Sequence, residues 1–218
     1  MLQIYLIHSP NFVKLMNIAV LSNKTITQEL PDSTLDMQYH FFEKMPEKSV
    51  LSSFDAFIQL EETAATYSYD DIGIPVFINS VSFTLQQFQH PSHVVRFNGW
   101  SGFLKRDMWE LAGEMSIAHQ AVLKAMGKTY VVLPDEPGFI SARVLAMIIN
   151  EAFFARESGV STEADIDIAM KLGTNYPMGP FEWADVVGVK NVWQLLKTLS
   201  VRDSKYNPSV LLEKSINE

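Results

Sequence analysis

The apolar pattern of this 218-residue chain changes along its length. In the first half, short apolar stretches alternate with polar segments, and the clearest of them are 16–22, 54–62, 74–81 and 93–100. Short runs rich in β-branched residues are typical of buried strands. Strands separated by segments of helix length favour an α/β fold with a mostly parallel sheet. The stretch 36–45 fits either a strand or a helix.

The second half has a helical pattern. Residues 107–127 are helix-like after their first positions and lead into a short strand at 129–133. Beyond it, apolar residues recur every fourth position from Ile140 to Ala152, which predicts a helix buried over more than half of its girth. Further helices are predicted at 161–173, in the short stretch that ends at Gly188, and at 191–200.

These patterns predict two domains. The first is an α/β domain over residues 1–133, and the second is an all-helical domain over residues 134–218. Residues 1–15 could be an appended extension, because Met16 opens a cleaner strand and either Met1 or Met16 could be the start. The hinge between the domains is expected in the sequence LPDEPG at 133–138.

Composition excludes several classes of protein. A net charge of −8 argues against a general nucleic-acid binder, which needs a basic surface to displace counterions from phosphates. The absence of cysteine excludes disulfides and thiolate metal sites, and the histidines lack the spacing of a metal site. No apolar run is long enough to span a membrane, and no signal peptide is recognisable. We therefore expect a cytoplasmic protein.

The residues from 137 to 188 carry a specific motif. They include PGFISAR, then ESGVSTEADIDIAMKLGTNYPMGPFEWADVVG. This run resembles the C-terminal helical domain of the 3-hydroxyacyl-CoA dehydrogenases, a family that oxidises 3-hydroxyacyl-CoA with NAD. The resemblance implies a Rossmann-like sheet domain followed by that helical domain. Here the sheet domain is shortened, because the stretch between its first strand and Asn98 is much shorter than in the family.

The resemblance continues upstream in short pieces. INSVSFTL stands where the family has S-N-T-S-S-L, and VRFNGW stands where it has H-F-F-N-P. The residues that the resemblance makes catalytic candidates are Glu110, Ser82 and Asn98. In the same alignment the proton-accepting His of the family is matched by Val95, and a substrate-binding Asn by Ala142. Neither side chain can accept a proton or a hydrogen bond, so the resemblance implies a degenerate active site.

The family binds NAD with a glycine-rich turn after the first strand, where the backbone approaches the pyrophosphate. In this chain no glycine occurs before Gly73. We therefore expect no cofactor, and NAD only if the family activity survives. Arg96, next to Val95, could pair with an anionic ligand such as a CoA phosphate or form a surface ion pair.

Three functions remain open at this point. The first is a divergent family member that cannot transfer hydride and acts as an acyl-CoA-binding or assembly module. The second is an active dehydrogenase with relocated catalytic residues, for which His90 and His93 are the available bases. The third is a purely structural homodimer. The resemblance implies that a homodimer would form through the helical domain, where Trp183 and Trp193 lie either in the interface or in the core.

Overall fold

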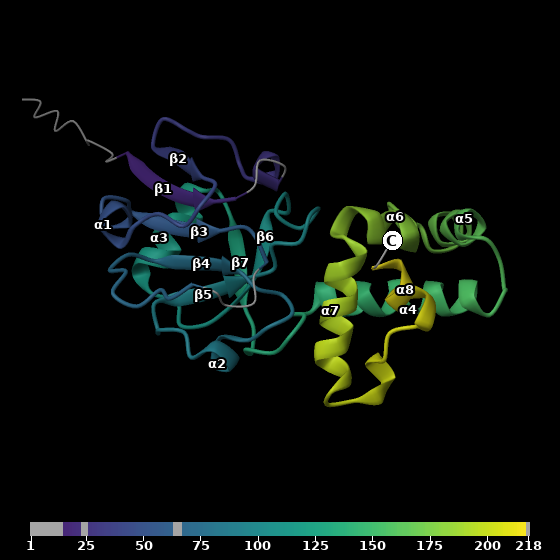
Figure 1. Ribbon diagram of the computed structural model, residues 1–218. Helices are drawn as coiled ribbons and strands as arrows, with labels where there is room; N and C mark the ends of the chain where they lie inside the picture. Colours follow the sequence, from purple (N-terminus) through teal and green to yellow (C-terminus); the bar gives the residue numbers. More distant parts are fainter. Residues whose placement is uncertain (1–14, 23–25, 63–66, 217–218) are drawn as a thin grey trace, which may run out of the picture.

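The computed structural model describes residues 15–22, 26–62 and 67–216, so the predicted extension lies almost entirely outside the described residues. One sheet occupies the first half of the chain, and helices occupy the second half (Figure 1). The strands are β1 (Met16–Leu21), β2 (Met37–Phe42), β3 (Ala56–Gln59), β4 (Val76–Asn79), β5 (Val94–Phe97), β6 (Met108–Ala112) and β7 (Thr129–Val132). The stretch 36–45, which fitted either type of element, contains strand β2.

The strand order is β2-β1-β3-β4-β5-β6-β7. Strands β1 to β5 pair in parallel, β6 runs antiparallel to β5, and β7 is parallel to β6. Strand β1 lies between β2 and β3, so the chain reverses its direction of winding at this point. In open α/β sheets ligands bind at such a reversal, beyond the carboxyl ends of the strands. The mostly parallel α/β sheet predicted from the sequence is confirmed.

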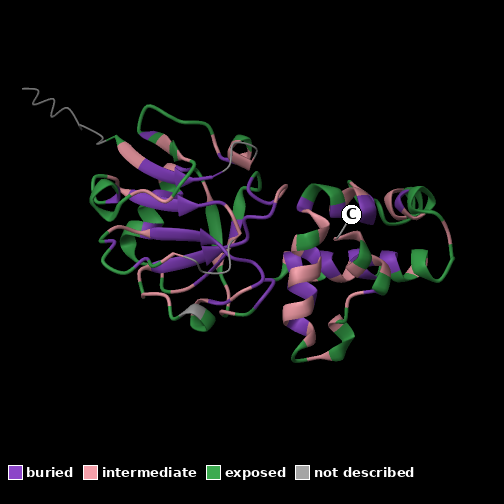
Figure 2. Cartoon of the chain, viewed as in Figure 1, coloured by how far each residue is buried: buried purple, intermediate pink, exposed green. Residues whose placement is uncertain are grey.

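The two faces of the sheet are covered unequally. Ile18 and Val20 of β1 face helix α3 (Ile117–Ala125), whereas Ala19 and Leu21 face the short helix α1 (Lys48–Leu51). Strands β3, β4 and β5 are buried along their whole length (Figure 2). Burial on both faces explains why these strands read as continuous apolar runs.

The connections between the strands are short. Only the 3-10 helix η1 (Ile26–Glu29) is described between β1 and β2, and only α1 lies between β2 and β3. Helix α2 (Leu85–Phe88) connects β4 to β5. Within the described residues, none of these connections contains a full crossover helix.

Residues 107–127 are helical only after their first positions, as the sequence predicts. This stretch contains strand β6 before helix α3. In β6, Trp109 and Leu111 point to the buried face while Met108 is exposed, which is a two-residue period rather than a helical one. Ser116 then caps α3, and its hydroxyl accepts a hydrogen bond from the backbone N–H of His119.

The helical part surrounds one long helix. The helices are α4 (Ser141–Glu157), α5 (Glu163–Thr174), α6 (Pro180–Val187), α7 (Val189–Ser200), the 3-10 helix η2 (Ser204–Tyr206) and α8 (Val210–Ser215). Helix α4 contacts α5, α6, α7 and α8. The four helices predicted from the sequence, α4 to α7, are present close to their expected positions. No helix in the described part of the chain is long and apolar enough to cross a membrane.

The sheet and the helices share one apolar core. Val81, Trp100 and Phe103, which follow the carboxyl ends of β4 and β5, belong to the same cluster as the buried residues of α4, α6 and α7. Helix α7 stands between the sheet and the rest of the helices (Figure 1). Trp183 is half-buried against this cluster and lies 6.1 Å from the ring of Phe103, so the two parts are joined by direct packing.

The motif from 176 to 188 forms a helix start that is capped from a distance. Asp167, on α5, accepts hydrogen bonds from the backbone N–H groups of Phe181 (2.9 Å) and Glu182 (3.2 Å) in the first turn of α6. These N–H groups have no partner within their own helix, so a carboxylate there stabilises the helix.

Gly179 is required by the same contact. A Cβ at this position would lie 2.2 Å from Cγ of Asp167, which no side chain can tolerate without displacing the cap. The Gly179 N–H donates to Glu182 at 2.8 Å, and Glu182 also pairs with Lys171. The motif is therefore a packing and capping unit.

We predict that Gly179→Ala lowers the free energy of unfolding by about 1–3 kcal/mol, because the added methyl group overpacks the Asp167 cap. Urea denaturation followed by circular dichroism measures this difference. Gly173→Ala is the matched control, because a Cβ at that helical position meets no atom within 4 Å. We expect the control to be neutral or stabilising by up to about 1 kcal/mol. Equal effects of the two substitutions would contradict the capping role.

Candidate functional site

A polar cleft lies at the carboxyl ends of β3, β4 and β5, where the sheet meets helices α6 and α7. It has a volume of about 320 Å³. The residues that line it are Ile26, Leu60, Glu61, Glu62, Asn79, Gly99, Trp100, Ser101, Val187 and Asn191. This is the end of a parallel sheet at which α/β proteins bind ligands, so the cleft is the candidate functional site.

The cleft does not fit a dinucleotide. Its lining contains two carboxylates, Glu61 and Glu62, and no lysine or arginine. The described chain after β1 continues into η1, without a glycine turn and without an α-helix whose N-terminus could face a pyrophosphate. Glu29 of η1 accepts a hydrogen bond from the Gly102 N–H at 2.6 Å and another from the Ser101 hydroxyl. Glu29 is therefore a further carboxylate close to the cleft, and it accepts hydrogen bonds from the segment that follows β5.

Metal chemistry has no ready site either. Within residues 15–22, 26–62 and 67–216, no group of three or more His, Asp or Glu side chains is placed to hold a metal ion. The absence of a metal site stays a prediction from the sequence.

Glu62 forms the floor of the cleft. Its Oε1 accepts hydrogen bonds from the backbone N–H groups of Val81 (3.0 Å) and Ser82 (2.7 Å), and its Oε2 accepts one from the indole N–H of Trp100 (2.7 Å). Burial raises the pKa of the Glu62 carboxyl, whereas the hydrogen bonds from Ser82 and Trp100 lower it. No feature of the sequence pointed to Glu62.

The three catalytic candidates lie at two places. Glu110 and Asn98 meet at the junction of β5, β6 and the start of α4, where the Asn98 side-chain amide donates to the Glu110 carboxylate at 3.1 Å. Ser82 lies in the loop after β4, with its backbone bonded to Glu62. The structure thus brings two of the three candidates into contact.

Ser141 completes the Glu110 cluster and was missed from the sequence. Its hydroxyl donates to Oε2 of Glu110 at 2.6 Å, and its backbone N–H donates to Oε1 at 3.0 Å. Asn98 also donates to the Ser141 hydroxyl at 3.1 Å. Glu110 therefore caps the first turn of α4 and ties strand β6 to the helical part of the chain.

The positions matched to the family's His and Asn lie elsewhere. Val95 is fully buried in the apolar cluster between the sheet and α3, and Ala142 is fully buried in the cluster of the helices. The side chain that faces Glu110 is Asn98 rather than Val95. The geometry thus places Glu110 against Asn98 and Ser141, and Val95 in the apolar core.

The alternative bases are also remote. His93 precedes strand β5 and Asn98 follows it, so the two residues lie at opposite ends of the strand. A ring nitrogen of His93 is 3.0 Å from the Tyr69 carbonyl oxygen, and the His90 ring packs edge-on against the Tyr69 ring. Burial lowers the pKa of His90. Neither histidine reaches Glu110 without a rearrangement of the strand.

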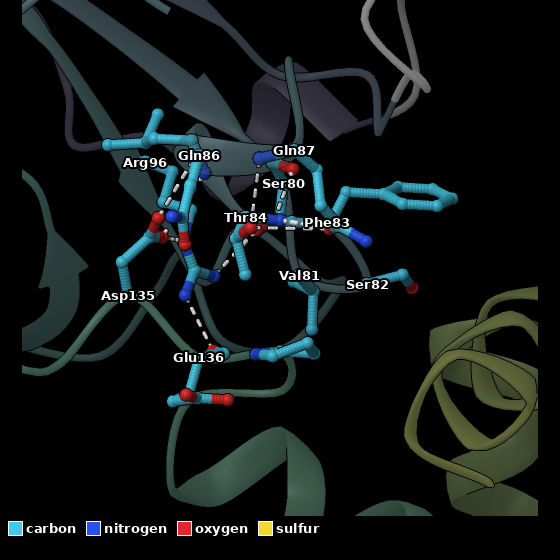
Figure 3. Close-up of polar contacts among 12 residues, drawn as sticks. Ser80, Val81, Ser82, Phe83, Thr84, Gln86, Gln87, Arg96, Asp135 and Glu136 are labelled. Atoms are coloured by element: carbon cyan, nitrogen blue, oxygen red, sulfur yellow. Dashed lines mark hydrogen bonds and ion pairs between the residues drawn. The ribbon is translucent and has the colours of Figure 1, made fainter. Parts of the chain in front are cut away.

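Arg96 is a completely buried cation at the hinge. Its Nε donates to Oδ1 of Asp135 at 2.5 Å, and its terminal nitrogens donate to the carbonyl oxygens of Ser80 (3.0 Å) and Glu136 (2.5 Å) (Figure 3). The guanidinium carbon lies 4.2 Å from the centre of the Phe139 ring. Burial lowers the pKa of Arg96, and the hydrogen bond to Asp135 opposes that shift.

Arg96 does form an ion pair, as one sequence interpretation held, but its own side chain is buried and not at the surface. It does not line the candidate cleft, and its pairing with an anionic ligand stays a prediction. Arg96 lies within a short apolar strand, and nothing local in that strand indicates its buried ion pair. The partners that explain it, Asp135 and Glu136, lie far along the chain in the segment that precedes α4. Asp135 also accepts hydrogen bonds from the N–H groups of Leu85 (3.2 Å) and Gln86 (3.1 Å).

The helical part of the chain matches a known protein family. Residues 138–218 match the family described as 3-hydroxyacyl-CoA dehydrogenase, C-terminal domain. A Bacillus subtilis protein named "Probable 3-hydroxybutyryl-CoA dehydrogenase" is 42% identical over 105 residues, which cover 47% of this chain and 37% of that protein. The 3-hydroxyadipyl-CoA dehydrogenase of Escherichia coli is 44% identical over 92 residues, which cover 41% of this chain and 19% of that protein. The chain thus spans well under half the length of these relatives.

The crystal structure of (S)-3-hydroxybutyryl-CoA dehydrogenase from Ralstonia eutropha has the same fold. It superposes with a TM-score of 0.68 and 18% sequence identity, and the match covers 94% of each chain. The similarity therefore extends over the sheet as well as the helices. At 18% identity, this similarity shows a shared arrangement of helices and strands.

We predict that Arg96→Leu lowers the free energy of unfolding by about 3–5 kcal/mol, because Asp135 loses its cationic partner and the carbonyl oxygens of Ser80 and Glu136 lose a donor. Arg202→Leu is the matched control. Arg202 pairs with Glu136 at 2.6 Å on the exposed side of the same segment, so its loss should cost less than about 1 kcal/mol. Chemical denaturation of both variants measures the difference, and a control as costly as Arg96→Leu would contradict the clamp.

Proposed function

We propose that this chain is a member of the 3-hydroxyacyl-CoA dehydrogenase family that does not transfer hydride and acts as a binding or assembly module. Its membership rests on residues 138–218, which match the C-terminal domain of that family. The observation that carries the proposal is the environment of Glu110. This carboxylate is bonded to the Asn98 amide and to Ser141, and neither group is a base.

The chemistry of the family, as the resemblance implies it, requires a side chain that removes the proton of the substrate hydroxyl. An amide such as that of Asn98 has no accessible pKa for this task. Glu110 could accept a proton, but it is engaged by the start of α4 and serves to hold that helix. The acidic lining of the cleft, which does not fit a dinucleotide, supports the same conclusion.

An assembly role is supported by the surface of the helical part. Two apolar grooves flank the outer side of α4, with volumes of about 560 and 350 Å³. Both grooves are lined by Val144 and Ile148. Ile140, just before α4, and Val144, within it, are each more than half exposed. A continuous apolar surface of this kind is typical of an interface, so we propose that two copies associate through α4.

An acyl-CoA ligand is the second form of this proposal. The groove of about 350 Å³ is apolar, is bordered by Arg106, and begins at Ser141 beside the Glu110 cluster. Its size and composition suit the acyl part of such a ligand, with a cation at its edge for a negative group. Calorimetry with acetoacetyl-CoA tests it, and the absence of heat at millimolar concentration would leave assembly as the function.

We predict no NAD-dependent oxidation of 3-hydroxybutyryl-CoA by the purified chain at high protein loading. Loss of a general base alone costs about 10²–10⁴-fold in rate. With the cofactor cleft also lost, we expect a rate below about 10⁻⁴ of that of an active family dehydrogenase assayed in parallel. The measurement is the absorbance of NADH, with a blank that lacks the chain.

Turnover clearly above the blank would favour the alternative, an active dehydrogenase with relocated residues. Calorimetry with NADH then separates the two possibilities. Binding at micromolar to millimolar concentration supports the active enzyme, and no binding identifies the turnover as contamination.

We predict that Val144→Glu converts a dimer into a monomer, because it places a charge at the centre of the apolar surface on α4. Multi-angle light scattering should show the dissociation constant raised at least about tenfold. Ile117→Glu is the control, since Ile117 is 86% exposed on α3 and lies in the sheet part of the chain. A native chain that is monomeric at every concentration would refute the homodimer.

A further inference from the structure

Three N–H donors converge at the floor of the cleft. They are the consecutive backbone N–H groups of Val81 and Ser82 and the indole N–H of Trp100, which comes from the end of a different strand. All three point at the two oxygens of one carboxylate, at 2.7 to 3.0 Å. Paired backbone donors with a third donor from a side chain are the usual composition of an anion-binding site.

The donors are held in place from behind. The Ser80 carbonyl oxygen accepts from Arg96, and the Val81 carbonyl oxygen accepts from the N–H of Gly138 at 2.8 Å. These bonds fix the carbonyl groups of the loop toward the hinge, so its N–H groups are directed to the other side. In Figure 3 the Ser82 side chain likewise points away from Arg96 and Asp135. The backbone of this loop is therefore also held by contacts that do not involve Glu62.

We propose that these donors form a binding site for a small carboxylate, and that Glu62 is its built-in occupant. The Glu62 side chain reaches the donors from the segment after β3 and lines the floor of the open cleft. While it is there, a carboxylate from solution finds no free donor and meets the negative charges of Glu61 and Glu62. Removal of the Glu62 side chain exposes the three donors to the cleft.

The size of the site selects the ligand class. Two oxygens on one carbon satisfy all three donors, as the Glu62 carboxylate shows. Formate and acetate carry the same group, and each can enter the space left by a side chain of glutamate size. The inference concerns the donors alone and is independent of whether the chain oxidises any substrate.

The experiment compares Glu62→Ala with Glu61→Ala in formate, acetate and chloride at equal ionic strength. Glu61 lines the same cleft and carries the same charge, but the three donors are not bonded to it. We expect Glu62→Ala to melt at a lower temperature than the native chain, because three buried donors lose their acceptor. Formate should then raise its melting temperature in a saturable manner, by about 5 °C at 100 mM for a half-saturation near 1 mM.

Tryptophan fluorescence gives a second readout, since the Trp100 indole N–H bonds directly to the carboxylate. The emission of Glu62→Ala should return toward that of the native chain as formate saturates. The native chain and Glu61→Ala should show neither response. Glu62→Gln should also be unresponsive, because its side chain still fills the site.

A saturable formate response that is equal in Glu61→Ala and Glu62→Ala would overturn the proposal, as would no response in Glu62→Ala. If Glu62→Ala is insoluble, the same comparison is made on the soluble yield after refolding with 100 mM formate or chloride. A higher yield with formate supports the site, and equal yields contradict it.

Discussion

The guanidinium of Arg96 is the contact on which the rest of the structure depends. It is the one arginine whose side chain has no solvent exposure among the ion pairs of the described residues. A buried cation is costly, and it is retained here because its hydrogen bonds are almost fully satisfied by Asp135, Ser80 and Glu136. The result is a cluster of polar contacts beside the apolar core. It fixes the segment before α4, the loop after β4, and through them the orientation of the helices on the sheet.

Glu110 also joins the sheet to the helices, because it lies on β6 and accepts a hydrogen bond from the start of α4. It holds the first turn of α4, while Asp167 holds the first turn of α6. In each case a carboxylate on one element caps a helix on another. Asp167 and Gly179, which lie in the part of the chain that matches the family, therefore serve to join elements of the fold. Such contacts fix the arrangement of the elements, which is separate from any chemistry at the cleft.

The parts of the fold that follow local rules could be predicted from the sequence. The buried strands read as apolar runs, and α4 to α7 follow from periodicity with glycine at their ends. The apolar pattern alone shows strand β6 poorly, because DMWEL alternates only over a few residues and the chain soon continues into helix α3. The candidate site was less predictable, because its contacts are not local. Glu110 meets Asn98 and Ser141 from other elements, and Glu62 meets donors that follow two other strands.

The buried charge of Arg96 also has a consequence for the order of synthesis. Asp135 lies 39 residues beyond Arg96, so the ribosome completes strands β1 to β5 before the partner of their central cation exists. During that interval the guanidinium cannot be buried without a large penalty. The apolar face of Val81 and Trp100, which the helices later cover, is equally exposed. The folded sheet is therefore complete only when the segment at Asp135 and the helices after it are present.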